Sequence, residues 1–209
     1  MVYNNFFLRL LFSLIFISTY LICLHISIEL VFYLIFLIYL MVFFEIMIYF
    51  KKYKLLPIIY ILISFIFFVT IDFKNENYVG FNLFIIIVIT FDIFSYISGK
   101  YLGKKKLIKI SPNKTYEGLL GGILLSLIFS LLFSYLFEIN INKLLISYIF
   151  LTILCAFIGD VIESFFKRKN DLKNSSELIP GHGGVFDRFD SFLFSIIFYS
   201  IFYNFLIWK

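Results

Sequence analysis

Cysteine, histidine and proline are scarce in this chain of 209 residues, with two, two and three of them respectively. Cys23 and Cys155 both lie inside apolar runs, without CxxC spacing and without a pair of neighbouring histidines. We interpret both as small apolar packing residues, which is the common role of an isolated buried cysteine. The cysteines therefore indicate neither a metal site nor a redox compartment.

Charged side chains are also few, at 15% of residues, whereas apolar side chains make up 62% and the mean hydropathy is +1.02. Soluble domains are only about half apolar. Each apolar run of about 20 residues is long enough to cross a hydrocarbon core of about 30 Å. The runs are continuous rather than alternating, so they favour helices over a β-barrel. The sequence predicts an all-α polytopic membrane protein.

Seven spans are expected in a single membrane domain covering residues 1–209, in which 1–80 hold the N-terminal spans and 81–209 hold the polar motifs. The expected spans are 6–24, 28–50, 55–71, 81–98, 119–137, 143–160 and 190–208.

The basic residues are distributed unevenly between the two sides that this topology creates. All of the 18 Lys and Arg residues except Lys74, Lys143 and Lys209 fall on the side of the N-terminus. The positive-inside rule places that side, with the loops 51–54, 99–118 and 161–189, in the cytoplasm. The net charge of +5 does not indicate nucleic-acid binding, because the basic loops are short and also contain acids.

Two acids are expected deep inside the first four spans, Glu45 and Asp92. A carboxylate in hydrocarbon costs about 2.5–3.5 kcal/mol, so each should face protein or a water-filled cavity. For Glu45 we favour a hydrogen-bonded helix-packing contact. For Asp92 we favour a functional role, because Ser95, Tyr96 and Gly99 follow it on the same helix face.

The loop before the fifth span contains a candidate phosphate seat. Pro112 favours a turn, and Lys114 and Thr115 follow it directly ahead of a helix. The glycines of a P-loop are absent. Gly121 and Gly122, one turn into that helix, would allow another helix to approach closely.

The stretch 159–191 is the most polar part of the chain. Acids can hold a metal cation and bases can hold phosphates, whereas a charge cluster beside a membrane can also be merely solvated. His182 lies among three glycines that can adopt positive φ and present backbone N–H groups to an anion. It is either a phosphate contact, an acid–base group or a turn residue facing water. The charged residues are Asp160, Glu163, Lys167, Arg168, Lys169, Asp171, Lys173, Glu177, Asp187, Arg188 and Asp190.

Three aspartates of this stretch form a candidate metal site. If the sixth span continues as a helix, Asp160 shares a face with Glu163, Ser164 and Lys167. Asp187 and Asp190 lie one turn apart at the start of the last span, where the helix dipole favours anions. Three adjacent carboxylates would repel one another unless a cation joined them. Oxygen ligands without cysteine favour Mg²⁺ over Zn²⁺.

These residues closely resemble the signature of the phosphatidate cytidylyltransferases, also called CDP-diacylglycerol synthases. The signature S-x-x-K-R-x₄-K-D-x-[GSA]-x₂-[LIF]-[PG]-x-H-G-G-x-x-D-R-x-D runs from Ser164 to Asp190, and an earlier block resembles the stretch from Asp92 to Gly122. Glu45 resembles an N-terminal glutamate of the bacterial members. One departure is Asn174, which stands where the signature has an aspartate. Its matching residues are Ser164, Lys167, Arg168, Lys173, Ser176, Ile179, Pro180, His182, Gly183, Gly184, Asp187, Arg188 and Asp190.

The resemblance implies that the chain transfers CMP from CTP to phosphatidate, giving CDP-diacylglycerol and pyrophosphate, in a bacterial inner membrane. It implies Mg²⁺, and room for a second cation, on Asp160, Asp187 and Asp190. Catalytic roles are implied for these three aspartates and for the basic residues Lys167 and Arg168. Both a single chain and a homodimer are compatible with the sequence. Substrate-binding roles are implied for Asp92, Lys114, Thr115, Glu163, Ser164, Lys173, His182, Gly183, Gly184 and Arg188.

Two alternatives remain open at the level of sequence. A CTP-dependent kinase of a polyprenol or phytol would need the same phosphate and metal groups. A non-enzymatic transporter of an anionic solute would need broken helices with paired charges at the membrane midplane, whereas the charges here collect at one face.

Overall fold

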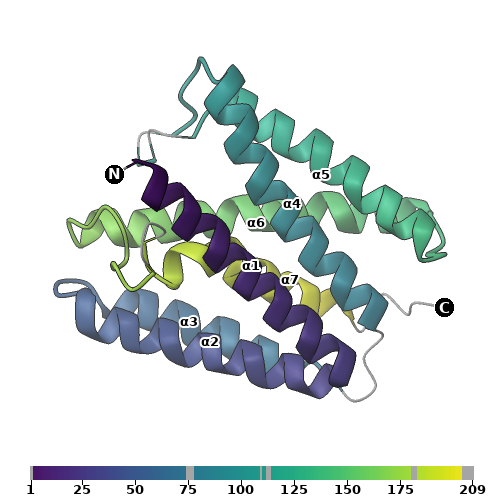
Figure 1. The fold of residues 1–209 in the computed structure, drawn as a ribbon, viewed down its shortest axis with the longest axis horizontal. Coiled ribbons are helices and arrows are strands. Elements are labelled where there is room, and N and C mark those ends of the chain that lie inside the picture. Colours follow the sequence, from purple (N-terminus) through teal and green to yellow (C-terminus); the bar gives the residue numbers. More distant parts are fainter. Residues whose placement is uncertain (1, 74–77, 109, 112–113, 180–182, 204–209) are drawn as a thin grey trace. The chain divides into compact units, whose positions relative to one another are not determined.

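The computed structural model describes residues 2–73, 78–108, 110–111, 114–179 and 183–203 of the chain (Figure 1). Its described residues form seven α-helices and no strand, apart from two isolated bridges, Lys106 to Thr115 and Ile179 to Gly183. The all-α prediction is therefore confirmed. The helices are α1 (Val2–Ile26), α2 (Ile28–Tyr49), α3 (Leu55–Val69), α4 (Tyr78–Leu102), α5 (Tyr116–Leu136), α6 (Lys143–Lys169) and α7 (Phe186–Tyr203).

Four described helices, α2, α4, α5 and α6, are long and apolar enough to cross a membrane, so the chain is a multi-pass membrane protein. The apolar part Leu14–Ile26 and helix α3 are shorter. Helix α6 continues beyond the expected end of its span, as far as Lys169. Helix α7 begins at Phe186, ahead of the expected residue 190. The expected start was late because the first turns of α7 carry charged residues, which hydropathy alone assigns to a loop.

The chain divides into two compact units, which are described separately. The first comprises Met1–Glu76 with Phe166–Phe189, and the second comprises Asn77–Phe165 with Asp190–Lys209. In the first unit, aromatic side chains of α2 and α3 pack together, with the rings of Phe32 and Phe68 stacked 5.0 Å apart. The buried hydroxyl groups of Tyr39 and Ser64 share a hydrogen bond of 2.6 Å, so α2 and α3 are also joined by a satisfied polar contact.

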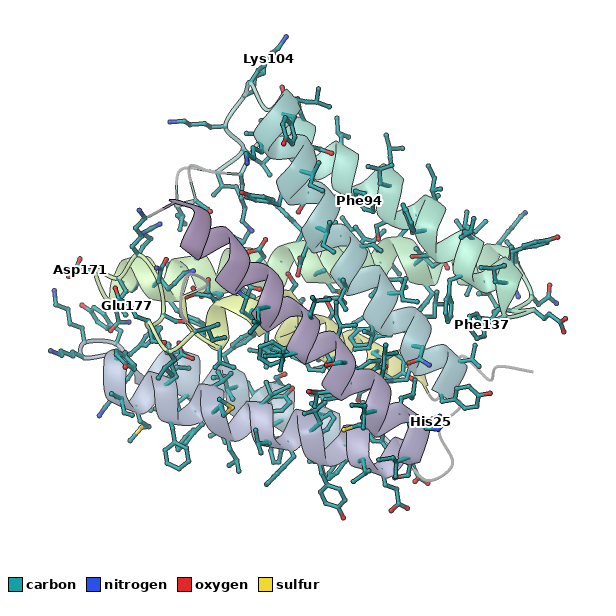
Figure 2. All side chains as sticks on the ribbon, in the orientation of Figure 1. His25, Phe94, Lys104, Phe137, Asp171 and Glu177 are labelled. Carbon is teal, nitrogen blue, oxygen red and sulfur yellow. The ribbon has the colours of Figure 1, made fainter. Side chains whose placement is uncertain are left out.

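The first unit also ties the α2–α3 loop to the end of α6. The Asn170 side chain is buried, and its Oδ1 accepts from the backbone N–H groups of Lys52 and Tyr53 at 3.0 and 3.2 Å. Lys52 also pairs with Asp171, which projects from the loop after α6 (Figure 2). The hydrogen bond to Asp171 raises the pKa of the exposed Lys52 ammonium. This loop is therefore held mainly by the buried amide of Asn170.

In the second unit, α4 and α5 pack closely through glycines. A Cβ at Gly121 would lie 2.1 Å from the Oγ of Ser98, and one at Gly122 would lie 2.9 Å from the Cβ of Ser95. The prediction that this glycine pair admits a neighbouring helix is thus confirmed. The buried hydroxyl of Ser126 on α5 also donates to the carbonyl of Ile87 on α4 at 3.1 Å. The α4–α5 loop continues beyond these helices, with Lys104 projecting outward (Figure 2).

Candidate functional site

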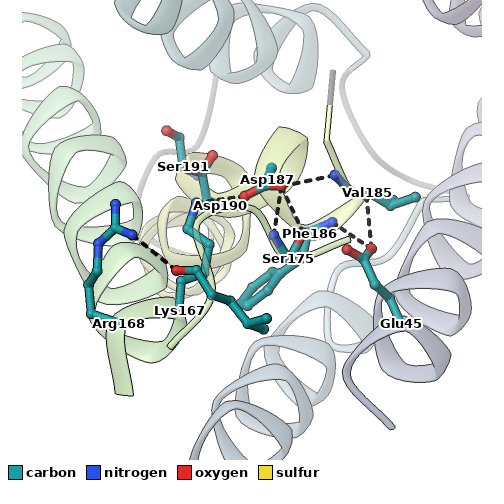
Figure 3. A network of polar contacts seen from close by, with 11 residues as sticks. Glu45, Lys167, Arg168, Ser175, Val185, Phe186, Asp187, Asp190 and Ser191 are labelled. Carbon is teal, nitrogen blue, oxygen red and sulfur yellow. Dashed lines mark hydrogen bonds and ion pairs between the residues drawn. The ribbon is translucent and has the colours of Figure 1, made fainter. Parts of the chain in front are cut away.

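Asp187, in the first turn of α7, is the centre of the polar network of the first unit (Figure 3). Its Oδ2 accepts from the backbone N–H and the hydroxyl of Ser175 and from the backbone N–H of Gly184, each at 2.9 Å. Its Oδ1 accepts from the ammonium of Lys167 at 2.6 Å. The Lys167 and Asp187 side chains are 13% and 9% exposed, so this ion pair is largely shielded from water.

The turn before α7 presents backbone N–H groups to two carboxylates of the chain itself. Gly183 has a φ of +86°, a left-handed conformation that glycine adopts without steric cost. The anions it meets belong to the chain itself: the N–H of Gly184 donates to Asp187, and those of Val185 and Phe186 donate to Glu45 Oε2 at 2.8 and 3.0 Å. Glu45 makes the hydrogen-bonded contact expected of it, with α7 as its partner.

The remaining predicted bases of the first unit lie at its surface. Arg168 donates to the backbone carbonyl of Leu172 at 3.0 Å, which closes the end of α6 onto the following loop. Lys173 and Arg188 are exposed, as is Asn174, the residue that departs from the signature. His182 lies outside the described residues, as do Pro112 and Pro180. Exposed cationic side chains near the Lys167–Asp187 pair have the chemistry needed to hold a polyphosphate.

Carboxylates from three helices gather in the second unit around Asp190. Asp190 of α7 is buried and hydrogen-bonded to Asp160 of α6, and the charges of Glu163 and Asp92 also act on it. Asp92 Oδ1 accepts from the hydroxyl of Ser191 at 2.7 Å. We call Asp92, Asp160, Glu163 and Asp190 the carboxylate cluster.

Gly159 allows α7 to approach α6 at this cluster. A Cβ at Gly159 would lie 2.5 Å from the backbone oxygen of Asp190 and 3.0 Å from the Cβ of Phe194. Any larger residue would therefore push α7 away and separate Asp190 from Asp160, which directly follows Gly159. Gly159 therefore makes possible the contact between Asp160 and Asp190.

Lys114 supplies a positive charge to the carboxylate cluster. It precedes α5 and forms an ion pair with Asp160. Thr115, the residue before α5, caps the helix by accepting from the N–H of Gly118 at 3.0 Å, as expected for threonine at this position. The cap orders the chain next to Lys114, so the lysine emerges from a defined helix start.

The predicted site residues thus fall into two groups, each within its own unit. Asp160 and Asp190 are brought together in the second unit with Asp92, Lys114 and Glu163. Asp187 lies one turn before Asp190 on α7 and forms the network of the first unit, with Lys167 and Gly184. Ser164 is buried on α6.

Three side chains of these networks were not predicted as site residues: Glu45, Ser175 and Ser191. Ser175 lies inside the signature but at a position where the pattern allows any residue. Ser191 directly follows the last aspartate of the signature and reaches Asp92, 99 residues earlier. Each of these residues bonds to a partner at least 12 residues away in the sequence, so the spacing of residues did not indicate their roles.

Oxygen donors are the appropriate chemistry for a magnesium ion at the carboxylate cluster. Among the described residues, no group of three or more His, Cys, Asp or Glu side chains is arranged to hold a metal ion by itself. Mg²⁺ in nucleotide-using sites takes only one or two carboxylates from the protein and completes its shell with water and phosphate oxygens. The pair of half-buried Asp160 and buried Asp190 fits that demand.

Comparison with known families identifies the class of protein to which this fold and these charged groups belong. The model of the cytidylyltransferase family matches residues 4–206, so the chain belongs to this family. The match includes both the carboxylate cluster and the network around Asp187.

Individual relatives share substantial sequence identity with the chain. A phosphatidate cytidylyltransferase of Staphylococcus aureus (strain COL) is 40% identical over 142 residues, which is 67% of this chain and 54% of the relative. Phosphatidate cytidylyltransferases of Staphylococcus epidermidis and Staphylococcus haemolyticus are 38% and 39% identical over 142 and 143 residues. The chain spans about half the length of these relatives.

Proposed function

We propose that this protein transfers CMP from CTP to phosphatidate and releases pyrophosphate. The observation that carries the proposal is the 40% identity over 142 residues to a protein named phosphatidate cytidylyltransferase. It is supported by two ion pairs, Lys167–Asp187 and Lys114–Asp160, which bring a candidate phosphate ligand beside a candidate metal ligand in each unit.

In this reaction an oxygen of the lipid phosphate attacks the α-phosphorus of CTP. The new P–O bond forms as the bond to the β-phosphate oxygen breaks, and pyrophosphate leaves with that electron pair. The attacking oxygen is already anionic at neutral pH, so the site does not need a strong general base. Its main task is to bring two polyanions together, which fixed positive charges make possible.

The bases of the signature can perform this task. Lys167 is largely buried, so its charge acts through a medium that screens it less than water does. Arg168, Lys173 and Arg188 are more exposed and suit the β- and γ-phosphates, which leave as pyrophosphate. Lys114, at the start of α5, suits the phosphate of the lipid or the α-phosphate of the nucleotide.

Mg²⁺ is the cofactor that this chemistry calls for, held by Asp160 and Asp190 with Asp187 as a further ligand. When bound, it would neutralise charge on the phosphates and polarise the α-phosphorus. Glu163 and Asp92 would support the bound ion indirectly, through the negative charge that they add to the carboxylate cluster. A second cation can be accommodated by the same acids.

The decisive experiment is an assay of the detergent-purified protein with CTP, phosphatidate and Mg²⁺. We expect CDP-diacylglycerol and pyrophosphate in equal amounts. In place of these products, CDP and a newly phosphorylated lipid, obtained with a polyprenol or phytol as acceptor, would show a lipid kinase. Uptake of an anionic solute into vesicles, without any product from CTP, would show a transporter.

We further propose that the protein lies in the bacterial inner membrane with its N-terminus and its basic loops in the cytoplasm. The asymmetry of Lys and Arg supports this orientation. It would give the site access to cytoplasmic CTP and to lipid headgroups of the inner leaflet. Cysteine accessibility at Lys104 and Glu138 would test it, because these exposed positions flank α5 at opposite ends. Labelling of the Lys104 position from outside, or of both positions from the same side, would contradict this orientation.

A further inference from the structure

Helix α7 is capped by a residue from another helix. The residue before α7 is Val185, whose apolar side chain cannot accept a hydrogen bond. The N–H groups of Val185 and Phe186 donate instead to Glu45 Oε2, which belongs to α2, at 2.8 and 3.0 Å (Figure 3). A carboxylate at a helix N-terminus satisfies unpaired N–H groups and meets the positive end of the helix dipole. Here that role falls to a residue 140 positions earlier in the chain.

Gly184 leaves the space that this carboxylate occupies. A Cβ at Gly184 would lie 1.7 Å from Glu45 Oε1 and 2.1 Å from the hydroxyl oxygen of Ser175. Both distances are far below any allowed contact, so even alanine would expel the carboxylate. The glycine is therefore needed for space at this position, whereas Gly183 is needed for its positive φ.

The environment of the Glu45 carboxylate is energetically unfavourable. The residue is 1% exposed, and within the part of the chain that the structure describes its Oε1 has no hydrogen-bond partner. A buried carboxylate oxygen without a donor is unfavourable, and an apolar side chain of similar size would fill the same space without this cost. Packing alone therefore does not account for a glutamate here.

The same turn also holds Asp187. Three successive N–H groups, those of Gly184, Val185 and Phe186, are shared between Asp187 and Glu45. A shift of the turn would therefore move the Asp187 carboxylate and, with it, the ammonium of Lys167 at 2.6 Å. The influence of Glu45 on the charged pair therefore passes through the hydrogen bonds of this turn.

We propose that Glu45 is a positioning residue, which fixes the first turn of α7 and thereby the Lys167–Asp187 pair. The contribution of Glu45 to catalysis rests on the proposed cytidylyltransferase function, whereas the effect of Glu45 on the turn does not. The two parts can be tested separately, because the first needs substrate and the second does not.

Hydrogen exchange measured by mass spectrometry tests the effect on the turn. In Glu45→Met, which keeps the bulk of the side chain and removes the acceptor, amides of the peptide 183–190 should exchange at least about tenfold faster, the equivalent of one lost charge-assisted hydrogen bond. Peptides of α5 should be unchanged, which excludes global unfolding. Glu29→Met, an exposed position at the other end of α2, is the matched control.

Unchanged exchange in Glu45→Met would overturn the proposal. If this variant does not fold, Glu45→Gln takes its place, because the amide keeps one acceptor oxygen and the side-chain shape. That variant should show a smaller acceleration confined to the same peptide, and wild-type exchange throughout would again overturn the proposal.

The contribution of Glu45 to catalysis is tested by comparing the turnover of Glu45→Met with that of the conservative variant Glu45→Gln. Glu45→Met should lower kcat by about 10- to 100-fold, as expected when reacting groups are displaced by about 1 Å. Glu45→Gln should lose less than about tenfold, because neutral hydrogen bonds are roughly half as strong as charged ones. Wild-type turnover in Glu45→Met, with faster exchange in the turn, would show that Glu45 orders α7 without affecting catalysis. An inactive wild type would instead refute the proposed function.

Discussion

The ammonium of Lys167, near the end of α6, lies 2.6 Å from Oδ1 of Asp187 in the first turn of α7. The other oxygen of that carboxylate accepts three hydrogen bonds from Ser175 and Gly184. Asp187 therefore orders the loop between the two helices and at the same time fixes a lysine. In the reaction proposed above, Lys167 would be held in place by the protein before a phosphate arrives, which is the preorganisation that electrostatic catalysis requires.

Lys167→Met should lower the turnover of CTP and phosphatidate by about 10²- to 10³-fold, the usual loss when one preorganised charged contact to a transition state is removed. Steady-state formation of CDP-diacylglycerol measures this. Lys169→Met is the matched control, since Lys169 is exposed and contacts the ring of Tyr53. It should stay within about twofold of wild type. Equal losses in the two variants would show a general effect of positive charge rather than a role for Lys167.

Asp190→Asn should raise the Mg²⁺ concentration needed for half-maximal turnover by at least about tenfold, because it removes one charged ligand from the carboxylate cluster. Titration of Mg²⁺ into chelator-treated protein measures the change. Asp171→Asn serves as control, since Asp171 is exposed and pairs with Lys52. An unaltered Mg²⁺ requirement in Asp190→Asn would remove Asp190 from the proposed metal ligands.

Gly121→Ala should destabilise the second unit by about 1–3 kcal/mol, as overpacking does, despite the better helix propensity of alanine. The added Cβ would lie 2.1 and 2.4 Å from the Oγ and Cβ of Ser98. Thermal unfolding in detergent measures the loss. Ser98→Gly in the same chain should restore most of the stability, whereas Ser98→Ala should not, since it retains the Cβ. Restoration by both would place the strain at the hydroxyl alone.

Asn174→Asp should change turnover by no more than about twofold, the typical effect of an exposed substitution. Asn174 is exposed, and its backbone lies in the loop that Ser175 attaches to Asp187. Comparison of kcat/KM for CTP in the two proteins measures the effect. A gain of more than about tenfold would show that an acid at this position belongs to the working site.

Local patterns in the sequence predicted the elements and the close contact of α4 with α5. The apolar runs predicted the helices, and Gly121 and Gly122 indicated a close approach that the structure confirms. The shared face of Asp160, Glu163 and Lys167 depended on the sixth span continuing as a helix beyond 160, and α6 extends through all three. These features depend on residues within a few turns of one another, which is the range over which helical periodicity carries information.

The contacts that assemble the polar networks could not be predicted in this way. Glu45 binds the turn before α7 through backbone N–H groups, which have no signature in the sequence. Ser191 reaches Asp92 across 99 residues, and Lys114 reaches Asp160 of α6 from the segment before α5. Each partnership is set by tertiary packing, so the resemblance to a known family indicated the participants but not their pairs.

The hydroxyl of Ser126, which donates to the carbonyl of Ile87, has a consequence for how the protein is made. Helices α4 and α5 follow one another in the chain and meet through glycines and this hydrogen bond, so their interface needs no later part of the chain. Contacts between neighbouring segments form early, because little chain entropy is lost in closing them. We expect the two helices to leave the insertion machinery as a preassembled hairpin, which cross-linking of Thr90→Cys with Ser126→Cys, whose hydroxyl oxygens lie 3.1 Å apart, would detect in chains halted after α5. Helices α6 and α7 would then add their acids and bases to a scaffold that already exists.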